Sequence, residues 1–231
     1  DQYIQSLPDK ESDVVLLSLG EETLAVHGQY PFPRQTYAQL ISDLRNANAG
    51  MIAFTLMFPE ADRFGGDEVF ISWVKDNGII LAQDASSRGR SDTAPYVGTA
   101  TLGAGDAYDF VPKYKGLVTN IKALEEVAWG VGLINAGVEV DNITRRIPLL
   151  SQINGQLYPA MPLEIIRVIQ DKPSYSLKAD LDGIKDVMIP PYEPIKTDYN
   201  SSIWLNTNYT HVEYEYGKDV LPNLQGRTVL V

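Results

Sequence analysis

The chain has 231 residues, enough to bury one substantial core, and with 44% hydrophobic and 21% charged residues its composition is that of a globular protein. Its formal net charge of -11 argues against nucleic acid and against an anionic membrane surface as partners, because both bind clustered basic side chains. The lack of cysteine excludes disulfides and thiolate chemistry, and two histidines, His27 and His211, are too few for most zinc sites. We therefore expect no cofactor and no metal.

The first third of the chain predicts strands that alternate with helices. Apolar residues 14–19 and 51–58 are each typical of a buried strand. The helix between them is indicated by four residues at helical spacing: Tyr37, Leu40, Ile41 and Leu44. A second helix around 69–74 and a strand over 79–82 follow. Strand, helix and strand in this order predict a right-handed βαβ arrangement with parallel strands.

The rest of the chain has a less regular pattern. Residues 83–116 show no sustained period and are expected to form a long loop with a functional or moving role, with one strand candidate at 96–102. Further predicted elements are a helical turn within 117–127, a strand within 130–138, a hairpin over 149–157, a helix over 160–169, and short strands at 175–177, 187–189, 203–205 and 228–231. The predicted fold class is α/β, with a mostly parallel sheet flanked by helices and a mixed or antiparallel extension in the C-terminal half.

Four acidic residues follow the first two predicted strands. Glu21 and Glu22 come after the first strand, and Glu60 and Asp62 after the second. The carboxyl ends of parallel strands are where open α/β sheets bind ligands, so these carboxylates are candidate ligand-binding groups. The favoured alternative is a solvated acidic rim, because charged loop residues are usually exposed.

Three arginines complete the set of candidate ligand-binding residues. Arg34, at the start of the first helix, has the geometry to clamp a carboxylate or phosphate, but pairing with Glu22 or Glu60 is the favoured interpretation. Arg145 and Arg146 alternate along a predicted strand, so only one of them faces a given pocket. An anion site that uses one of them is weighed against simple pairing with Asp141 or Glu139, and the pairing is favoured.

Other motifs carry weaker signals. His27 has the chemistry for pH sensing, but a single histidine in a predicted loop is more often incidental. The glycines of LGAGDA lack the lysine of a phosphate-binding loop, and the sequence contains no G-x-S-x-G motif. No catalytic residue is therefore predicted.

The order of several sequence blocks resembles a known sensor family. The blocks are the Tyr-Pro-Phe-Pro-Arg segment at 30–34 before the first helix, the F-x-x-x-F-P-E-x-D ending of the second strand, the D-N-I-T-R-R-I-P-L-L segment, the N-G-Q-L-Y-P-A turn, the I-W-L-N strand and the terminal L-Q-G-R-T-V-L-V. Together they span nearly the whole chain. In this order they resemble the CHASE2 sensor domain of bacterial transmembrane receptors.

This resemblance implies a single non-catalytic sensor domain over residues 1–231, on the extracytoplasmic side of a membrane-anchored protein. Residues 1–12 would lead into the domain from a preceding membrane span, and the membrane would be contacted only through flanking spans. The implied partners are a small-molecule or peptide ligand, a second copy of the domain, and a cytoplasmic cyclase, diguanylate cyclase, histidine kinase or serine/threonine kinase. Thr55 departs from the family pattern, in which an aspartate usually ends this strand.

Two other classes of function remain open from the residues alone. A periplasmic solute-binding protein would need two similar lobes joined by a hinge, and no second βαβ series is visible. A carboxylate-dependent glycoside hydrolase would need two of the strand-end acids to face each other across a sugar-sized cleft. The sequence does not place these acids relative to one another.

Overall fold

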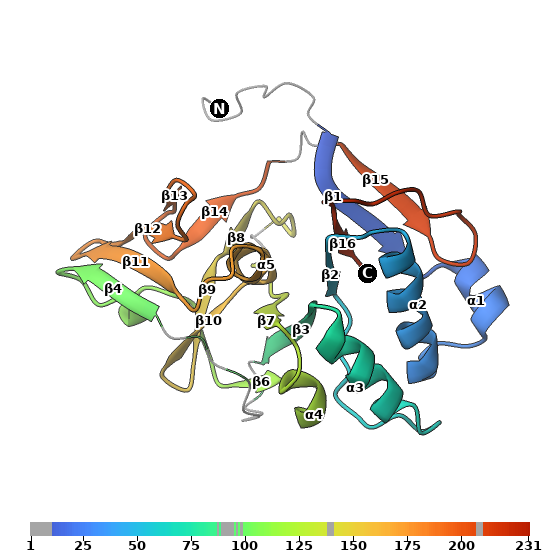
Figure 1. Ribbon diagram of the computed structural model, residues 1–231. Helices are drawn as coiled ribbons and strands as arrows, with labels where there is room; N and C mark the ends of the chain where they lie inside the picture. Colours follow the sequence, from blue (N-terminus) through green and yellow to red (C-terminus); the bar gives the residue numbers. More distant parts are fainter. Residues whose placement is uncertain are drawn as a thin grey trace.

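The computed structural model describes residues 11–86, 88, 95, 97, 99–137, 141–206 and 210–231. It is an α/β structure with 22% helix and 36% strand, in which parallel and antiparallel sheets are both present (Figure 1). The predicted fold class is therefore confirmed. Among the described residues, no helix is long and apolar enough to cross a membrane.

A seven-stranded sheet forms the first region of the molecule. Its strands are β1 (Glu11–Ser18), β2 (Met51–Phe54), β3 (Ile79–Ser86), β6 (Gly116–Val118), β7 (Gly130–Leu133), β15 (Thr210–Glu215) and β16 (Thr228–Leu230). Their order is β15-β1-β16-β2-β3-β6, and β7 also pairs with β3. Every pair in this sheet is parallel except β3 with β6.

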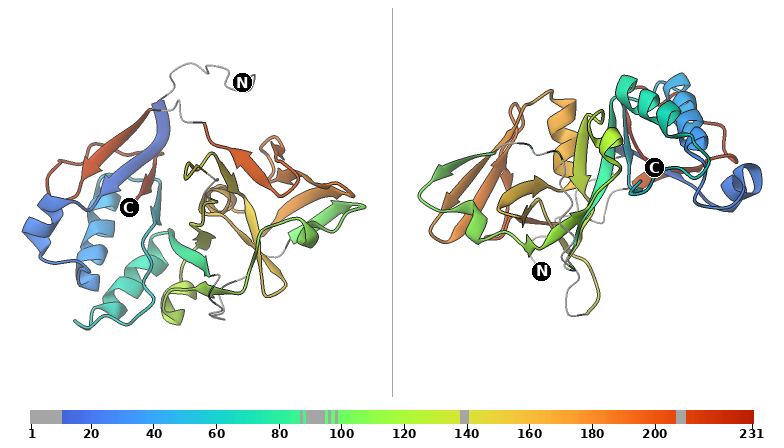
Figure 2. Two further views of the ribbon diagram at one scale, coloured as in Figure 1. Left: turned by 180° about the vertical axis from the view of Figure 1, so that it is seen from behind. Right: turned by 90° about the horizontal axis from the view of Figure 1, so that it is seen from below.

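Helices cover both faces of this sheet. The helices are α1 (Glu21–His27), α2 (Arg34–Asn46), α3 (Asp67–Asp76), α4 (Lys122–Glu125) and α5 (Met161–Ile169). Figure 2 shows α5 on the opposite side of the sheet from α2 and α3. Strand alternation explains this arrangement, because Ile52 and Phe54 of β2 pack with α2 and α3, whereas Met51 and Ala53 pack with α5.

The parallel arrangement of β1, β2 and β3 confirms the predicted βαβ pattern, with one difference in neighbours. The C-terminal strand β16 lies between β1 and β2 and pairs with both. Val229 of β16 is fully buried there. A short apolar strand carries no signal for its position in a sheet, so the sequence predicts the strand but not its place.

The second region consists of three smaller sheets. They are β10-β9-β5, β13-β12-β11-β4 and β14-β8. Their strands are β4 (Thr99–Gly103), β5 (Lys113–Tyr114), β8 (Arg146–Pro148), β9 (Leu150–Ile153), β10 (Gln156–Pro159), β11 (Tyr175–Asp180), β12 (Gly183–Met188), β13 (Ile195–Lys196) and β14 (Ser202–Trp204). The short 3₁₀ helix η1 (Ala107–Asp109) joins the same core. The predicted hairpin is present as β9 and β10, with Asn154 and Gly155 both at positive φ in its turn.

Several predicted bounds are wrong. The strand expected over 51–58 ends at Phe54, because Phe58 turns into the core and its N–H is bonded by the Asn120 side chain instead of a neighbouring strand. The loop expected over 83–116 contains the end of β3 and the elements β4, η1 and β5. The polar residues Gln83 and Asp84 continue β3 because β7 and β6 pair with them. The ends of the segments predicted at 96–102 and 130–138 lie in part outside the described residues.

Candidate functional site

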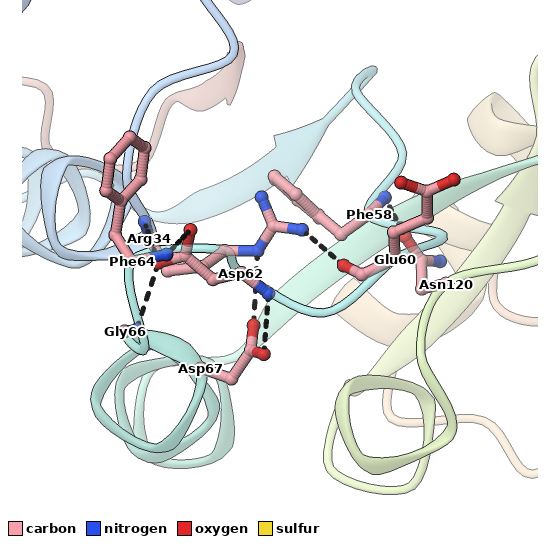
Figure 3. Close-up of polar contacts among 8 residues, drawn as sticks. All are labelled: Arg34, Phe58, Glu60, Asp62, Phe64, Gly66, Asp67 and Asn120. Carbon is pink, nitrogen blue, oxygen red and sulfur yellow. Dashed lines mark hydrogen bonds and ion pairs between the residues drawn. The ribbon is translucent and has the colours of Figure 1, made fainter.

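Arg34 lies at the centre of a closed polar cluster after β2 (Figure 3). Its Nη2 donates to the main-chain oxygen of Glu60 at 2.9 Å, and its Nε lies 3.4 Å from Oδ1 of Asp67. Its guanidinium carbon sits 4.5 Å from the centre of the Phe58 ring. We call Arg34, Glu60, Asp62 and Asp67 the Arg34 clasp. The predicted tie between Arg34 and the acidic loop is present, but through the backbone of Glu60 and through Asp67 instead of the carboxylates of Glu22 or Glu60.

Asp62 joins the starts of two helices within the clasp. Its Oδ2 accepts the N–H of Arg34, the first residue of α2, at 3.0 Å and the N–H of Gly66, which precedes α3, at 2.9 Å. Its Oδ1 accepts the N–H of Phe64. Partial burial raises the pKa of Asp62, but these three N–H donors and the charge of Arg34 outweigh it and hold the pKa below its usual range. Asp62 is therefore ionised and fully occupied with its own backbone.

The other predicted acids lie outside the clasp contacts. Glu21 and Glu22 form the exposed first turn of α1, where the sequence indicated a loop. The N–H of Glu22 donates to Oε1 of Glu215 at 2.9 Å. Because β16 lies between β1 and β2, the acids that follow β1 and those that follow β2 are not on adjacent strands. The side chain of Glu60 is exposed, and only its main-chain oxygen belongs to the clasp.

The two remaining candidate arginines bind different partners. Arg145 makes a two-point contact with Asp141 at 3.0 and 2.7 Å, which is the pairing that the sequence favoured. The hydrogen bonds from Arg145 hold the pKa of the exposed Asp141 down, at about 2. Arg146 lies 3.4 Å from Asp198 and stacks over the ring of Trp204 at 5.2 Å. The two side chains therefore serve separate contacts.

Thr55 lies where the resemblance led us to expect an aspartate. Its N–H and its hydroxyl both donate to the main-chain oxygen of Val231 at 2.8 Å. These two hydrogen bonds connect the residue after β2 with the residue after β16. An aspartate carboxylate is only an acceptor, so it could not replace the hydroxyl in this contact.

A second place at the ends of parallel strands is open. A cavity of about 590 Å³ lies beside the segment 216–221, which leaves β15, and the C-terminal half of α2. We call this cavity the trough. It is lined by His27, Asp43, Asn46, Ala47, Tyr216, Gly217, Lys218, Asp219, Val220 and Leu221. The N–H of Tyr216 donates to the main-chain oxygen of Ser18, which places the trough next to the carboxyl ends of both β1 and β15.

Tyr216 and Asp43 join the two walls of the trough. The Tyr216 hydroxyl donates to Oδ2 of Asp43 at 2.7 Å, and the Gln39 amide donates to Oδ1 of the same carboxylate at 2.8 Å. Burial and the neighbouring Asp43 charge raise the pKa of Tyr216, so its hydroxyl stays protonated. The His27 ring is stacked on the Tyr216 ring with centres 5.2 Å apart and an angle of 5° between the planes. The wall therefore presents a fixed carboxylate beside an aromatic pair.

Most residues of the trough were not predicted as site residues from the sequence. His27 was weighed as a loop residue, but it belongs to the last turn of α1. Asp43 and Tyr216 are separated by 173 positions, and nothing in the sequence places β15 next to β1. Hydroxyl and carboxylate residues are common on any surface, so only the folded chain identifies this pair. Within the described ranges, no group of three metal-ligating side chains is found, in the trough or elsewhere.

The fold and the trough define an α/β domain with a cavity of small-molecule size beside the carboxyl ends of β1 and β15. A family model described as the CHASE2 domain matches residues 1–231. The chain therefore belongs to the CHASE2 family, whose members are sensory extracytoplasmic domains. No curated protein and no solved structure matches the chain.

Proposed function

We propose that this chain is the sensory input module of a bacterial membrane-bound receptor, and that it passes a signal to a cytoplasmic cyclase or kinase. The family match over residues 1–231 is the observation that carries this proposal. The module is non-catalytic, and the receptor anchors it to the membrane through spans that flank the domain. The signal reaches the output domain because the stimulus stabilises one of two arrangements of the domain or of its dimer.

The trough is the ligand site in this proposal. It has the size of a small-molecule site, and its walls come from three separate elements: α1, α2 and the segment after β15. A ligand that contacts all three would fix their relative positions. The Arg34 clasp has no such role here, because Arg34 is paired with Asp67 and bonded to the Glu60 backbone, and Asp62 is bonded to backbone N–H groups.

Filling the trough tests this assignment. Asn46 lines the trough with an exposed side chain on α2, so Asn46→Trp places an indole in the cavity without disturbing the core. The matched control is Val69→Trp, on the exposed surface of α3 outside the trough lining. We expect that at least one compound in a panel of amino acids, sugars, dicarboxylates and polyamines raises the Tm of the parent chain and of Val69→Trp, but not that of Asn46→Trp.

Two results would count against the assignment. A compound that still raises the Tm of Asn46→Trp binds elsewhere. A panel that leaves the Tm of the parent unchanged favours an assembly signal over a small-molecule ligand. In the full-length receptor, the same compound should change cyclase or kinase output with the parent domain and not with Asn46→Trp.

A further inference from the structure

Strand β15 forms an open edge of the seven-stranded sheet. In the described part of the chain it pairs only with β1, and Figure 1 shows it at the outer rim of the molecule. Edge strands present unpaired N–H and C=O groups to other chains, and proteins usually protect them with lysine or proline. The sequence of β15, THVEYE, contains neither. Among the described residues, no strand pairs with its outer edge.

Hydrogen bonds at the end of β15 show which backbone groups point outward. The N–H of Tyr216 donates to Ser18 of β1, and the main-chain oxygen of Tyr214 accepts the Ser18 hydroxyl, so even-numbered residues face β1. Because the direction alternates along a strand, the backbone groups of His211, Glu213 and Glu215 face away from β1. The N–H of Glu215 is already bonded to Oδ2 of Asp219 at 2.7 Å. His211 and Glu213 remain, and their side chains are exposed.

We propose that β15 pairs with β15 of a second copy of this chain, antiparallel, about a two-fold axis through Val212. In this register His211 of each copy lies opposite Glu213 of the other, and the outward backbone groups of both residues form four hydrogen bonds. The imidazole and the carboxylate are complementary, and the pair occurs twice. The proposal deepens the proposed sensory function by naming the surface that joins two receptors.

The neighbouring registers are less favourable. An axis through Glu213 places the two Glu213 carboxylates opposite each other, and like charges directly opposite are destabilising. An axis through His211 pairs the two imidazoles with each other and loses the imidazole–carboxylate pairs. An axis through Glu213 also requires the N–H of Glu215, which Asp219 already binds. Among the described residues, β4 also has an unpaired edge, but TATLG has no charged side chain to select a register or a partner. The observations therefore favour β15 and Val212.

Disulfide trapping tests the axis directly, because the chain has no cysteine of its own. Residues at a non-hydrogen-bonded antiparallel position have Cα atoms about 4.5 Å apart, which suits a disulfide. We expect Val212→Cys to form a covalent dimer under mild oxidation. The control is Leu102→Cys on the β4 edge, where the side chain is 54% exposed and no dimer is expected. Failure of Val212→Cys to cross-link, or equal cross-linking of both variants, would overturn the proposal.

Charge exchange tests the register without a covalent bond. His211→Glu places two carboxylates opposite each other at both ends of the pair, and we expect the dimer dissociation constant in sedimentation experiments to rise about tenfold. The double variant His211→Glu/Glu213→His restores opposite partners and should return to within about threefold of the parent. An unchanged dissociation constant for His211→Glu contradicts the register. Neither experiment uses a ligand or a receptor output, so both can fail while the sensory function stands.

Discussion

The Arg34 clasp and the trough both follow the carboxyl ends of parallel strands, yet they differ in what their charges do. In the clasp, Arg34 is 7% exposed; it forms an ion pair with Asp67 and donates to the main-chain oxygen of Glu60. In the trough, the Asp43 carboxylate accepts hydrogen bonds from two neutral donors of the described residues, Gln39 and Tyr216. At the rim, Nζ of Lys218 lies 3.5 Å from Oε2 of Glu215. Charged residues thus close the clasp, whereas those of the trough leave it open.

The difference lies in the local chain path. After β2, residues 55–66 lead to α3, and near the end of this loop the N–H groups of Phe64 and Gly66 both donate to Asp62. After β15, the segment 216–221 runs past the C-terminal half of α2 and contacts it through one side-chain hydrogen bond, from Tyr216 to Asp43. The proximity of acids to strand ends is therefore a poor guide to a ligand site unless their backbone surroundings are known.

Removing the clasp arginine should have the largest effect on stability. Arg34→Met removes the partner of the Glu60 oxygen and of Oδ1 of Asp67, and breaking this partly buried pair should cost about 2–3 kcal/mol of unfolding free energy. Urea denaturation checks the value. Arg34→Lys keeps the charge but not the planar fork, so it should fall between the parent and Arg34→Met. A cost below about 1 kcal/mol for Arg34→Met would show that the clasp is not a stabilising unit.

Asp62→Asn should have an intermediate effect, about 1–2 kcal/mol, because it removes the negative charge at the starts of α2 and α3. The folded-state pKa of Asp62 is lowered, so its contribution is present above the unfolded value of about 3.9 and is lost as the pH falls through the folded value. The stability difference between parent and variant should stay constant from pH 7 to about pH 5 and shrink below about pH 4.

Glu60→Gln is the matched control for Asp62→Asn. The Glu60 side chain is exposed and only its backbone takes part in the clasp, so the substitution should change the unfolding free energy by less than about 0.5 kcal/mol. If both Glu60→Gln and Asp62→Asn lowered the unfolding free energy equally, the net charge would determine the effect, and not the hydrogen bonds of Asp62 at the starts of α2 and α3.

Local patterns predicted much of the fold. The apolar stripe of α2 places Tyr37, Leu40, Ile41 and Leu44 in the core, and Asn154-Gly155 marks a real hairpin turn. Both signals act within a few residues of each other, so no distant contact is needed to read them. The same holds for α5, which has the predicted bounds within one residue.

Features that depend on distant pairing were not predicted. The insertion of β16 between β1 and β2 joins residues near the two ends of the chain, and any apolar strand of that length would fit the same place. Arg34 was expected to contact Glu22 or Glu60, and the choice of Asp67 depends on the path of the loop before α3. The trough likewise requires β15 beside β1, which the sequence does not encode locally.

Apart from the control substitutions, the smallest loss of unfolding free energy is expected at the trough, from Tyr216→Phe. It removes one hydrogen bond to a half-buried carboxylate that keeps its bond from Gln39, so the cost should be about 1 kcal/mol. The folded-state pKa of Tyr216 is raised, so its contribution is present below the unfolded value of about 10 and is lost as the pH rises above that value. The stability difference between parent and variant should therefore hold at pH 7–9 and fall at higher pH. Tyr214→Phe, two residues earlier and within β15, has no hydroxyl partner among the described residues and should cost less.

Hydrogen exchange then shows whether the trough moves independently of the clasp. Because one side-chain bond ties the segment 216–221 to α2, Tyr216→Phe should speed the exchange of amides in this segment and leave Gly66 and Arg34 unchanged. Faster exchange at both places would mean that the two regions open together. An independent response is what a sensory site requires, since a ligand can shift only an equilibrium that already exists between a looser and a tighter trough.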